Sequence, residues 1–220
     1  MRGIVVIGMV RALRKWMKHT GATSIEGLAP EDMALLTDRR VTPEPWYPYD
    51  QYLRLMQASF DLLCRGDWTT LREYCSKGVA PVYELGYTPL LYVGDPERTM
   101  QAVSVLWRSC HSFGSAQARS DSTGTTIHVI GYPDVGELDG NVNAGWFLGM
   151  ARCAGATVTK VEIRCRPWAR EGDEQVVRLD WHMAARASDD ERGGELRIGR
   201  GRDHGRSDDA RPPIAARLTG

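Results

Sequence analysis

The chain has 220 residues, of which 42% are hydrophobic, enough for one domain of ordinary size or two small ones. Lysine plus arginine and aspartate plus glutamate both number 28, so the net charge gives no attraction to nucleic acid or to an anionic membrane. The five cysteines form no C-x-x-C pair, and we interpret them as reduced core residues of a cytoplasmic protein. The apolar run at residues 4–10 is too short to cross a bilayer and lacks a cleavage site, so neither a membrane helix nor a signal peptide is expected.

The chain begins with a predicted helical part. Residues 4–7 are expected to form a short extended segment. The spacing of Met9, Leu13 and Trp16 predicts a helix over residues 8–19 with a basic outer face. We interpret that face as solvated surface; a helix lying on a membrane surface is the alternative.

A proline-rich connector follows a short helix that is predicted over residues 30–37. Three prolines within residues 41–50 exclude a regular helix and predict an extended chain. Trp46 and Tyr47 in this connector need an apolar surface. That surface is either the neighbouring helices or the rim of a pocket.

Two more helices are predicted over residues 50–66 and 67–79, with Asp50 and Asp67 as their N-caps. Each helix carries apolar residues at helical spacing, which favours a buried stripe. Residues 81–94 are apolar but are broken by glycine and proline, so no regular structure is predicted there.

A strong helix start lies at residues 95–97, where an aspartate precedes proline and glutamate. The predicted helix extends to residue 113 and places Trp107 on its buried stripe. Residues 115–123 form a polar strand or loop, and residues 125–130 predict a strand because they are rich in β-branched side chains.

The clearest pattern is a helix followed by a hairpin. Apolar residues at helical spacing predict a helix over residues 138–153. Gly145 and Gly149 lie inside it, and each costs about 1 kcal/mol relative to alanine. We expect them to permit close approach of the sheet backbone. Alternation predicts strands over residues 157–166 and 176–181, so that the helix covers the apolar face of a hairpin.

These elements predict an α+β fold, in which an N-terminal helical part packs on a small antiparallel sheet of about four strands with one covering helix. We expect residues 1–94 to form the helical part and residues 95–183 to form a sensor-like α+β part, the two making one compact domain. Residues 184–220 have almost no large apolar side chain, which predicts a disordered tail. Aspartates interleave with its arginines and argue against nucleic-acid binding.

Two parts of the sequence resemble known proteins. The first is Gly3 followed by the helix to His19, then Pro45-Trp46-Tyr47-Pro48 and a long helix. The second is the hairpin pattern Val161-x-Ile163-x-Cys165-Arg166, Gly172-Asp173, Leu179-x-Trp181. Both are similar to an uncharacterised, lineage-expanded bacterial family best known from myxobacteria. The hairpin is shared more loosely with haem–NO-binding sensor domains and with four-vinyl-reductase-type ligand-binding domains. The resemblance covers residues 3 to 182 and implies a small-molecule sensor-like fold with a pocket between helices and sheet.

The chain departs from this pattern in two places. Haem–NO-binding domains carry a Tyr-x-Ser-x-Arg motif that resembles a fork for the haem propionates, and the corresponding stretch, residues 127–133, lacks it. Relatives often carry a second cysteine in the last strand of the hairpin, where Gln175 or Val176 stands here. A metal pair based on Cys165 is therefore not expected.

His111 is the candidate haem or metal ligand. The resemblance places it near the ligand helix of haem-binding relatives, and neutral imidazole is a common ligand. The alternative is a histidine favoured at a helix C-terminus by the dipole. We therefore predict no cofactor and no metal, with haem on His111 as the alternative. No nucleophile elbow, P-loop or dinucleotide fingerprint appears in the sequence, so no catalytic residue is predicted.

The sequence thus predicts a non-enzymatic regulatory or sensory protein that binds a small apolar ligand or a protein partner, and neither nucleic acid nor membrane. The residues expected to bind the ligand are Trp46, Tyr47, Trp107, His111 and Trp146. Two alternatives stay open: a haem-based gas sensor with His111 as axial ligand, and a ligand-free scaffold or interaction protein. The oligomeric state is also open, and a homodimer is among the alternatives.

Overall fold

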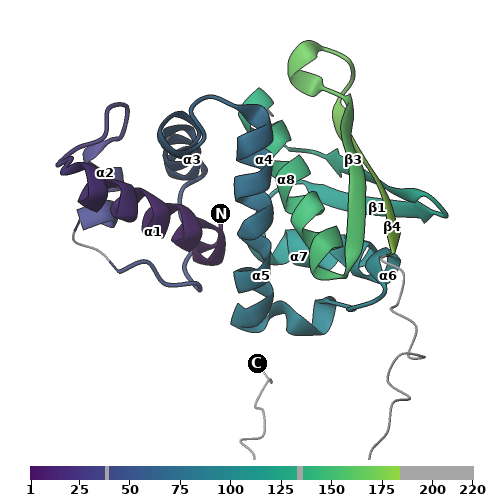
Figure 1. The fold of residues 1–220 in the computed structure, drawn as a ribbon. Helices are drawn as coiled ribbons and strands as arrows, with labels where there is room; N and C mark the ends of the chain where they lie inside the picture. Colours follow the sequence, from purple (N-terminus) through teal and green to yellow (C-terminus); the bar gives the residue numbers. More distant parts are fainter. Residues whose placement is uncertain (38–39, 133–135, 184–220) are drawn as a thin grey trace, which may run out of the picture. The chain divides into compact units, whose positions relative to one another are not determined.

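The computed structural model describes residues 1–37, 40–132 and 136–183, and the predicted tail over residues 184–220 lies outside them. Helices come first, then two strands, one long helix and two more strands, which together form an α+β fold (Figure 1). The helices are α1 (Gly3–Thr20), α2 (Pro30–Thr37), α3 (Tyr49–Leu63), α4 (Trp68–Lys77), α5 (Val79–Val82), α6 (Pro96–Gln101), α7 (Val103–Cys110) and α8 (Glu137–Cys153). The strands are β1 (Ser115–Asp121), β2 (Gly124–Ile130), β3 (Ala156–Cys165) and β4 (Glu174–Met183).

The sheet has β2 and β4 at its centre. Among the described residues its order is β1-β2-β4-β3, and each neighbouring pair is antiparallel. Ile127 pairs with Val177 and Thr125 pairs with Leu179, and all four residues are fully buried. Because alternate residues of a strand point to the same face, the two central strands share one core-facing surface. The predicted strands over residues 157–166 and 176–181 are confirmed as a pair.

Helix α8 lies between the sheet and α4, and it is buried on both of these sides (Figure 1). A Cβ atom at Gly145 would lie 2.7 Å from the carbonyl oxygen of Arg72, and one at Gly149 would lie 2.5 Å from that of Ser76. The glycines therefore permit close approach to the backbone of α4, and the expectation that they face the sheet is wrong. Side-chain periodicity predicts one buried stripe, which is why it missed the second buried side of α8.

The N-terminal helices are joined by ionic contacts and by the connector. Arg54 on α3 donates from Nε and Nη2 to the fully buried Asp32 on α2, at 2.5 and 3.0 Å. The backbone N–H of Tyr47 donates to the carbonyl oxygen of Met1 at 2.8 Å, so the connector runs beside the start of α1. In the part of the chain that the structure describes, no helix is long and apolar enough to cross a membrane.

Two helix starts confirm the predicted caps. The side chain of Asp67 accepts the N–H of Thr70 at 2.7 Å, and that of Asp95 accepts the N–H of Arg98 at 2.9 Å. Asp50 is different, because α3 already begins at Tyr49 and Asp50 lies in its first turn. The predicted cap at Asp50 is therefore wrong.

Two helix boundaries also differ from the prediction. Residues 4–7 belong to α1 and are not extended, because all four are buried on the helix. Tertiary burial here outweighs the weak local preference of β-branched residues for strands. The helix predicted over residues 95–113 is two helices, which meet at Ala102. The second ends at Cys110, so His111 begins an extended segment with a φ of −121°.

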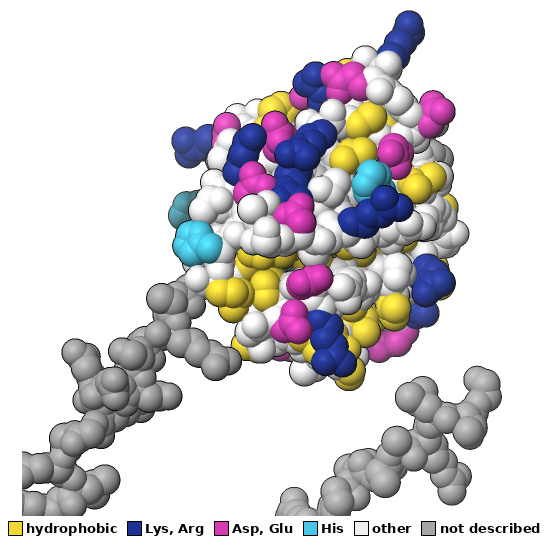
Figure 2. Space-filling view, turned by 90° about the vertical axis from the view of Figure 1, so that its right-hand side faces the viewer, with side chains coloured by type: hydrophobic (Ala, Val, Ile, Leu, Met, Phe, Trp, Pro, Cys, Tyr) yellow, Lys and Arg dark blue, Asp and Glu magenta, His cyan; other side chains and the backbone are white. Residues whose placement is uncertain are grey.

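The outer face of the sheet carries charges of both signs. Figure 2 shows Lys and Arg interleaved with Asp and Glu on the side that faces right in Figure 1. Arg178 on β4 donates to Asp121 at 2.7 and 2.9 Å and to Asp180 at 2.7 Å. Lys160 and Arg164 on β3 also pair with Glu162, at 3.2 and 3.0 Å.

Replacing a glycine of α8 is expected to destabilise the fold, whereas the same change in α1 is not. Gly145→Ala places a methyl group against the Arg72 carbonyl and is expected to lower the free energy of unfolding by about 1–3 kcal/mol through overpacking. Gly8→Ala is the matched control, because a Cβ atom there meets no other atom within 4 Å. It should raise stability by up to about 1 kcal/mol. Urea denaturation measures both, and equal effects would contradict the close α4–α8 contact.

Candidate functional site

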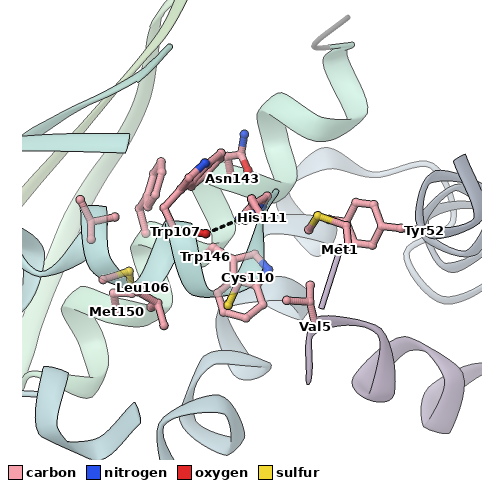
Figure 3. Close-up of a pocket in the computed structure, with 12 residues that line it drawn as sticks. Met1, Val5, Tyr52, Leu106, Trp107, Cys110, His111, Asn143, Trp146 and Met150 are labelled. Atoms are coloured by element: carbon pink, nitrogen blue, oxygen red, sulfur yellow. Dashed lines mark hydrogen bonds between the residues drawn. The ribbon is translucent and has the colours of Figure 1, made fainter. Parts of the chain in front are cut away.

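A small cavity lies at the end of α7, beside α8 and the start of α1 (Figure 3). Trp107, His111 and Trp146 from the predicted set line it, together with Met1 and Val5 of the N-terminal segment. Its volume is about 30 Å³, far below the roughly 300–1,000 Å³ of pockets that hold small molecules. Side chains from four helices, α1, α3, α7 and α8, therefore leave little free space around the imidazole.

His111 is held as a neutral imidazole. Its Nδ1 atom lies 3.2 Å from the carbonyl oxygen of Trp107, and because a carbonyl only accepts, Nδ1 carries the proton. The Trp107 indole stacks on the imidazole with the ring centroids 3.9 Å apart and the planes inclined by 7°. Burial lowers the pKa of His111 to about 3, and the Trp107 hydrogen bond only partly opposes this.

Aromatic rings fill the space between His111 and the start of α3. The ring centroid of Tyr132 lies 6.0 Å from that of His111 and 5.0 Å from that of Phe113. Phe113 in turn meets Tyr49 edge to face at 4.9 Å. Trp107 Nε1 donates to the Phe113 carbonyl at 3.1 Å and closes the turn between α7 and β1. Such edge-to-face contacts favour one fixed arrangement of the rings.

A larger cavity lies between α1 and the helices α4 and α5. Its volume is about 400 Å³, within the range of pockets that hold small molecules. Val5 and Trp146 border both cavities, so these two side chains separate them. Gly8 lines the larger cavity at a point where a Cβ atom would meet no other atom within 4 Å. Of these two cavities, the larger therefore has room for a ligand.

Trp46 and Tyr47 line neither of these two cavities. The Trp46 side chain is 46% exposed, and the guanidinium carbon of Arg2 lies 4.9 Å from its ring centroid. Tyr47 borders a separate hollow of about 310 Å³ near Arg54. The structure thus brings Trp107, His111 and Trp146 together, whereas the two connector residues lie beside the start of α1.

Asp139, in the first turn of α8, is a buried polar group that sequence analysis missed. The Tyr49 hydroxyl donates to its Oδ2 at 2.7 Å, whereas Oδ1 is buried without a partner among the described residues. Burial raises the pKa of Asp139 to about 6, against the opposing effect of the Tyr49 hydrogen bond. Tyr49 and Asp139 are 90 positions apart, so no local pattern connects them.

The described residues do not suggest a metal centre, since no three His, Cys, Asp or Glu side chains among them are placed to hold an ion. The cysteines have no mutual bonds in this part of the chain. The arrangement offers apolar cavities, a neutral imidazole and one buried carboxyl group. Apolar cavities with few polar groups are typical of sites that bind small molecules.

The fold is similar to that of H-NOX domains. An unliganded Fe(II) H-NOX mutant from K. algicida aligns with a TM-score of 0.55 and 12% identity over 83% of this chain and 97% of its own. A mutant H-NOX from T. Tengcongensis gives a TM-score of 0.56 and 12% identity over 82% and 97%. An oxygen-binding H-NOX domain related to soluble guanylate cyclases gives 0.53 and 12% over 82% and 95%. No protein-family model and no curated protein matches the sequence.

These comparisons confirm the distant resemblance to haem–NO-binding domains at the level of the fold. At 12% identity they do not extend to the chemistry of the pocket.

The buried carboxyl of Asp139 is expected to make stability depend on pH. Its folded pKa of about 6 exceeds the ordinary 3.8, so between these values the folded protein keeps a proton that the unfolded chain has lost. The free energy of unfolding should therefore fall as pH rises from about 4 to 6, by up to roughly 3 kcal/mol at about 1.4 kcal/mol per pKa unit.

Asp139→Asn removes this titration and keeps an oxygen for the Tyr49 hydroxyl. We expect the variant to be more stable than the wild type at pH 7.5 and to lose the slope between pH 4 and 6, as measured by urea denaturation. Asp173→Asn, at an exposed position in the β3–β4 connection, is the matched control and should leave the slope unchanged. An unchanged slope in Asp139→Asn would show that this carboxyl does not titrate abnormally.

Proposed function

We propose that this protein is a non-enzymatic regulatory or sensory protein that binds a small apolar ligand between α1 and the helices α4, α5 and α8. The observation that carries the proposal is the cavity of about 400 Å³ at this place. Its wall is mainly apolar, with Ile7, Met56 and Val82 among its residues. Burying apolar surface contributes about 25 cal/mol per Å², so a ligand that fills this space has a clear source of affinity.

The position of the cavity supports a signalling role. Helix α1 packs mainly against α2 and α3, whereas α4 packs closely against α8. A ligand between α1 and α4 would touch both groups of helices and stabilise the arrangement that closes around it. A ligand shifts a conformational equilibrium by its difference in affinity between the two states. Trp146 on α8 borders the larger cavity as well as the smaller one, so the surroundings of its indole would change when a ligand binds.

Some of the similar structures are of H-NOX proteins described with heme, Fe(II) or oxygen, so haem is the first ligand to consider. Three features of the cavity at His111 argue against it in this chain. The space of about 30 Å³ is far smaller than a tetrapyrrole, the Trp107 indole covers one face of the imidazole, and no Arg or Lys lines the cavity to pair with propionates. The residues present therefore do not fit a haem.

Haem added to the purified protein is expected to give no Soret band distinct from that of free haem, because Trp107 and the neighbouring side chains occupy the space beside His111. Absorption spectroscopy with and without dithionite measures this. A Soret band that shifts on reduction and disappears in His111→Ala would show that the cavity at His111 does hold haem, and would restore the haem-sensor alternative.

A neutral apolar fluorophore, N-phenyl-1-naphthylamine, is expected to bind saturably at one site. Gly8→Met should abolish that binding, because the new side chain enters the larger cavity from α1 without a clash. Gly8→Ala is the size control and should retain it. Fluorescence titration measures the binding, and mass spectrometry of an organic extract of the purified protein identifies any ligand carried from the cell.

The fold of Gly8→Met is checked by its unfolding free energy, which should not fall, since methionine favours helix over glycine. Fluorophore binding that is absent from the wild type, or equal in wild type and Gly8→Met, would contradict a ligand site in this cavity.

A further inference from the structure

We propose that the ligand of the larger cavity is a single-chain amphiphile with one anionic end, such as a carboxylate, whose apolar chain lies between α1 and α5. This inference rests on the proposed function and specifies the chemistry of the ligand. The juxtaposition that carries it is an apolar cavity whose charged wall residues are Arg11 and Lys77, with no aspartate or glutamate among the residues that line it.

The two cations come from different helices. Arg11 lies on α1, one turn beyond Gly8, and Lys77 is the last residue of α4. Both side chains are exposed, and both border the cavity. A single anionic group at the mouth of the cavity is therefore within the field of a positive charge from each side. Because both cations are exposed, each is expected to attract the anionic group with the modest strength of a surface ion pair.

Neither cation is neutralised by a bonded acid in the part of the chain that the structure describes. Arg11 makes no ion pair with a described residue. Lys77 is close enough to lower the pKa of Glu73, but the Glu73 carboxylate is held by Arg152 at 2.7 and 2.9 Å, and that bond is the first cause of the lowering. The positive charge at the mouth is thus left for a ligand.

The interior of the cavity selects a chain without further charges. Ile7, Met9, Met56, Val82, Leu85 and Trp146 supply apolar surface. The two methionines are flexible and polarizable, so they adjust to chains of different length and shape. A cationic amphiphile would meet two like charges, and a polyanion such as a nucleotide would bury charge against apolar side chains without partners. A ligand with one anionic end and one apolar chain can pair with the cations and also bury its chain against the apolar side chains.

The experiment compares three probes of equal chain length: dodecanoate, dodecanol and dodecylammonium. Each is used below its micellar concentration to displace N-phenyl-1-naphthylamine from the full-length protein at pH 7.5 and low salt. Dodecanoate should bind most tightly and dodecylammonium most weakly. Arg11→Gln and Lys77→Gln should each weaken dodecanoate by roughly three- to five-fold, the size of an exposed ion pair, and leave dodecanol unchanged. The preference for dodecanoate should shrink in 0.5 M NaCl, for which Debye screening is the reason.

Lys15→Gln is the matched control, because Lys15 is an exposed cation on the same helix that does not line the cavity. It should leave all three affinities unchanged. Dodecanol and dodecanoate binding equally, with no effect of Arg11→Gln, would overturn the anionic end group while the proposed apolar site stands. Failure of the neutral fluorophore and of every probe would overturn both. Binding that emerges only after deletion of residues 184–220 would assign the cavity to the chain's own tail and also overturn the inference.

Discussion

The close backbone contact between α4 and α8 is the constraint on which the rest of the structure depends. Gly145 and Gly149 bring α8 so near to α4 that even a methyl group at either position would strike a carbonyl oxygen. Arg152 adds a bidentate bond to Glu73 on the same side of the pair. Trp146 follows Gly145 in the chain, so the contact of Gly145 with α4 also fixes the position of the Trp146 side chain. The wall that separates the two cavities is therefore set by a helix contact and not by the sheet.

The opposite side of α8 is fixed to the sheet by buried amides. Gln175 on β4 donates from Nε2 to the Gly140 carbonyl at 2.7 Å and accepts from Asn143 Nδ2 at 3.0 Å. Buried polar groups with complete hydrogen bonds favour one arrangement over slipped alternatives. Helices α4 and α8 and the sheet are thus joined by close packing and buried hydrogen bonds. The N-terminal helices have their own ionic contact at Arg54 and Asp32, and the larger cavity lies at the boundary between the two groups.

The similarity to H-NOX domains concerns the arrangement of elements, whereas the pocket has its own chemistry. A histidine follows α7 and faces a cavity, but its neighbours Trp107 and Tyr132 occupy the surrounding space. The room for a ligand lies instead on the far side of Trp146, where Gly8 leaves a gap in the surface of α1. One fold can support different ligands because side chains, and not the backbone path, decide which space stays open.

The sequence by itself determined the elements whose signals are local. Alternation predicted β3 and β4, and aspartates capped α4 and α6, because each of these depends on residues within a few positions. Only the tertiary structure decided that the glycines of α8 face α4 and that residues 4–7 are helical. The hydrogen bond from Tyr49 to Asp139 also became apparent only there. The same holds for the candidate site, where Trp107, His111 and Trp146 converge and Trp46 and Tyr47 do not. Such contacts join residues far apart in the chain, and their free energy depends on what is buried against what, which no local pattern records.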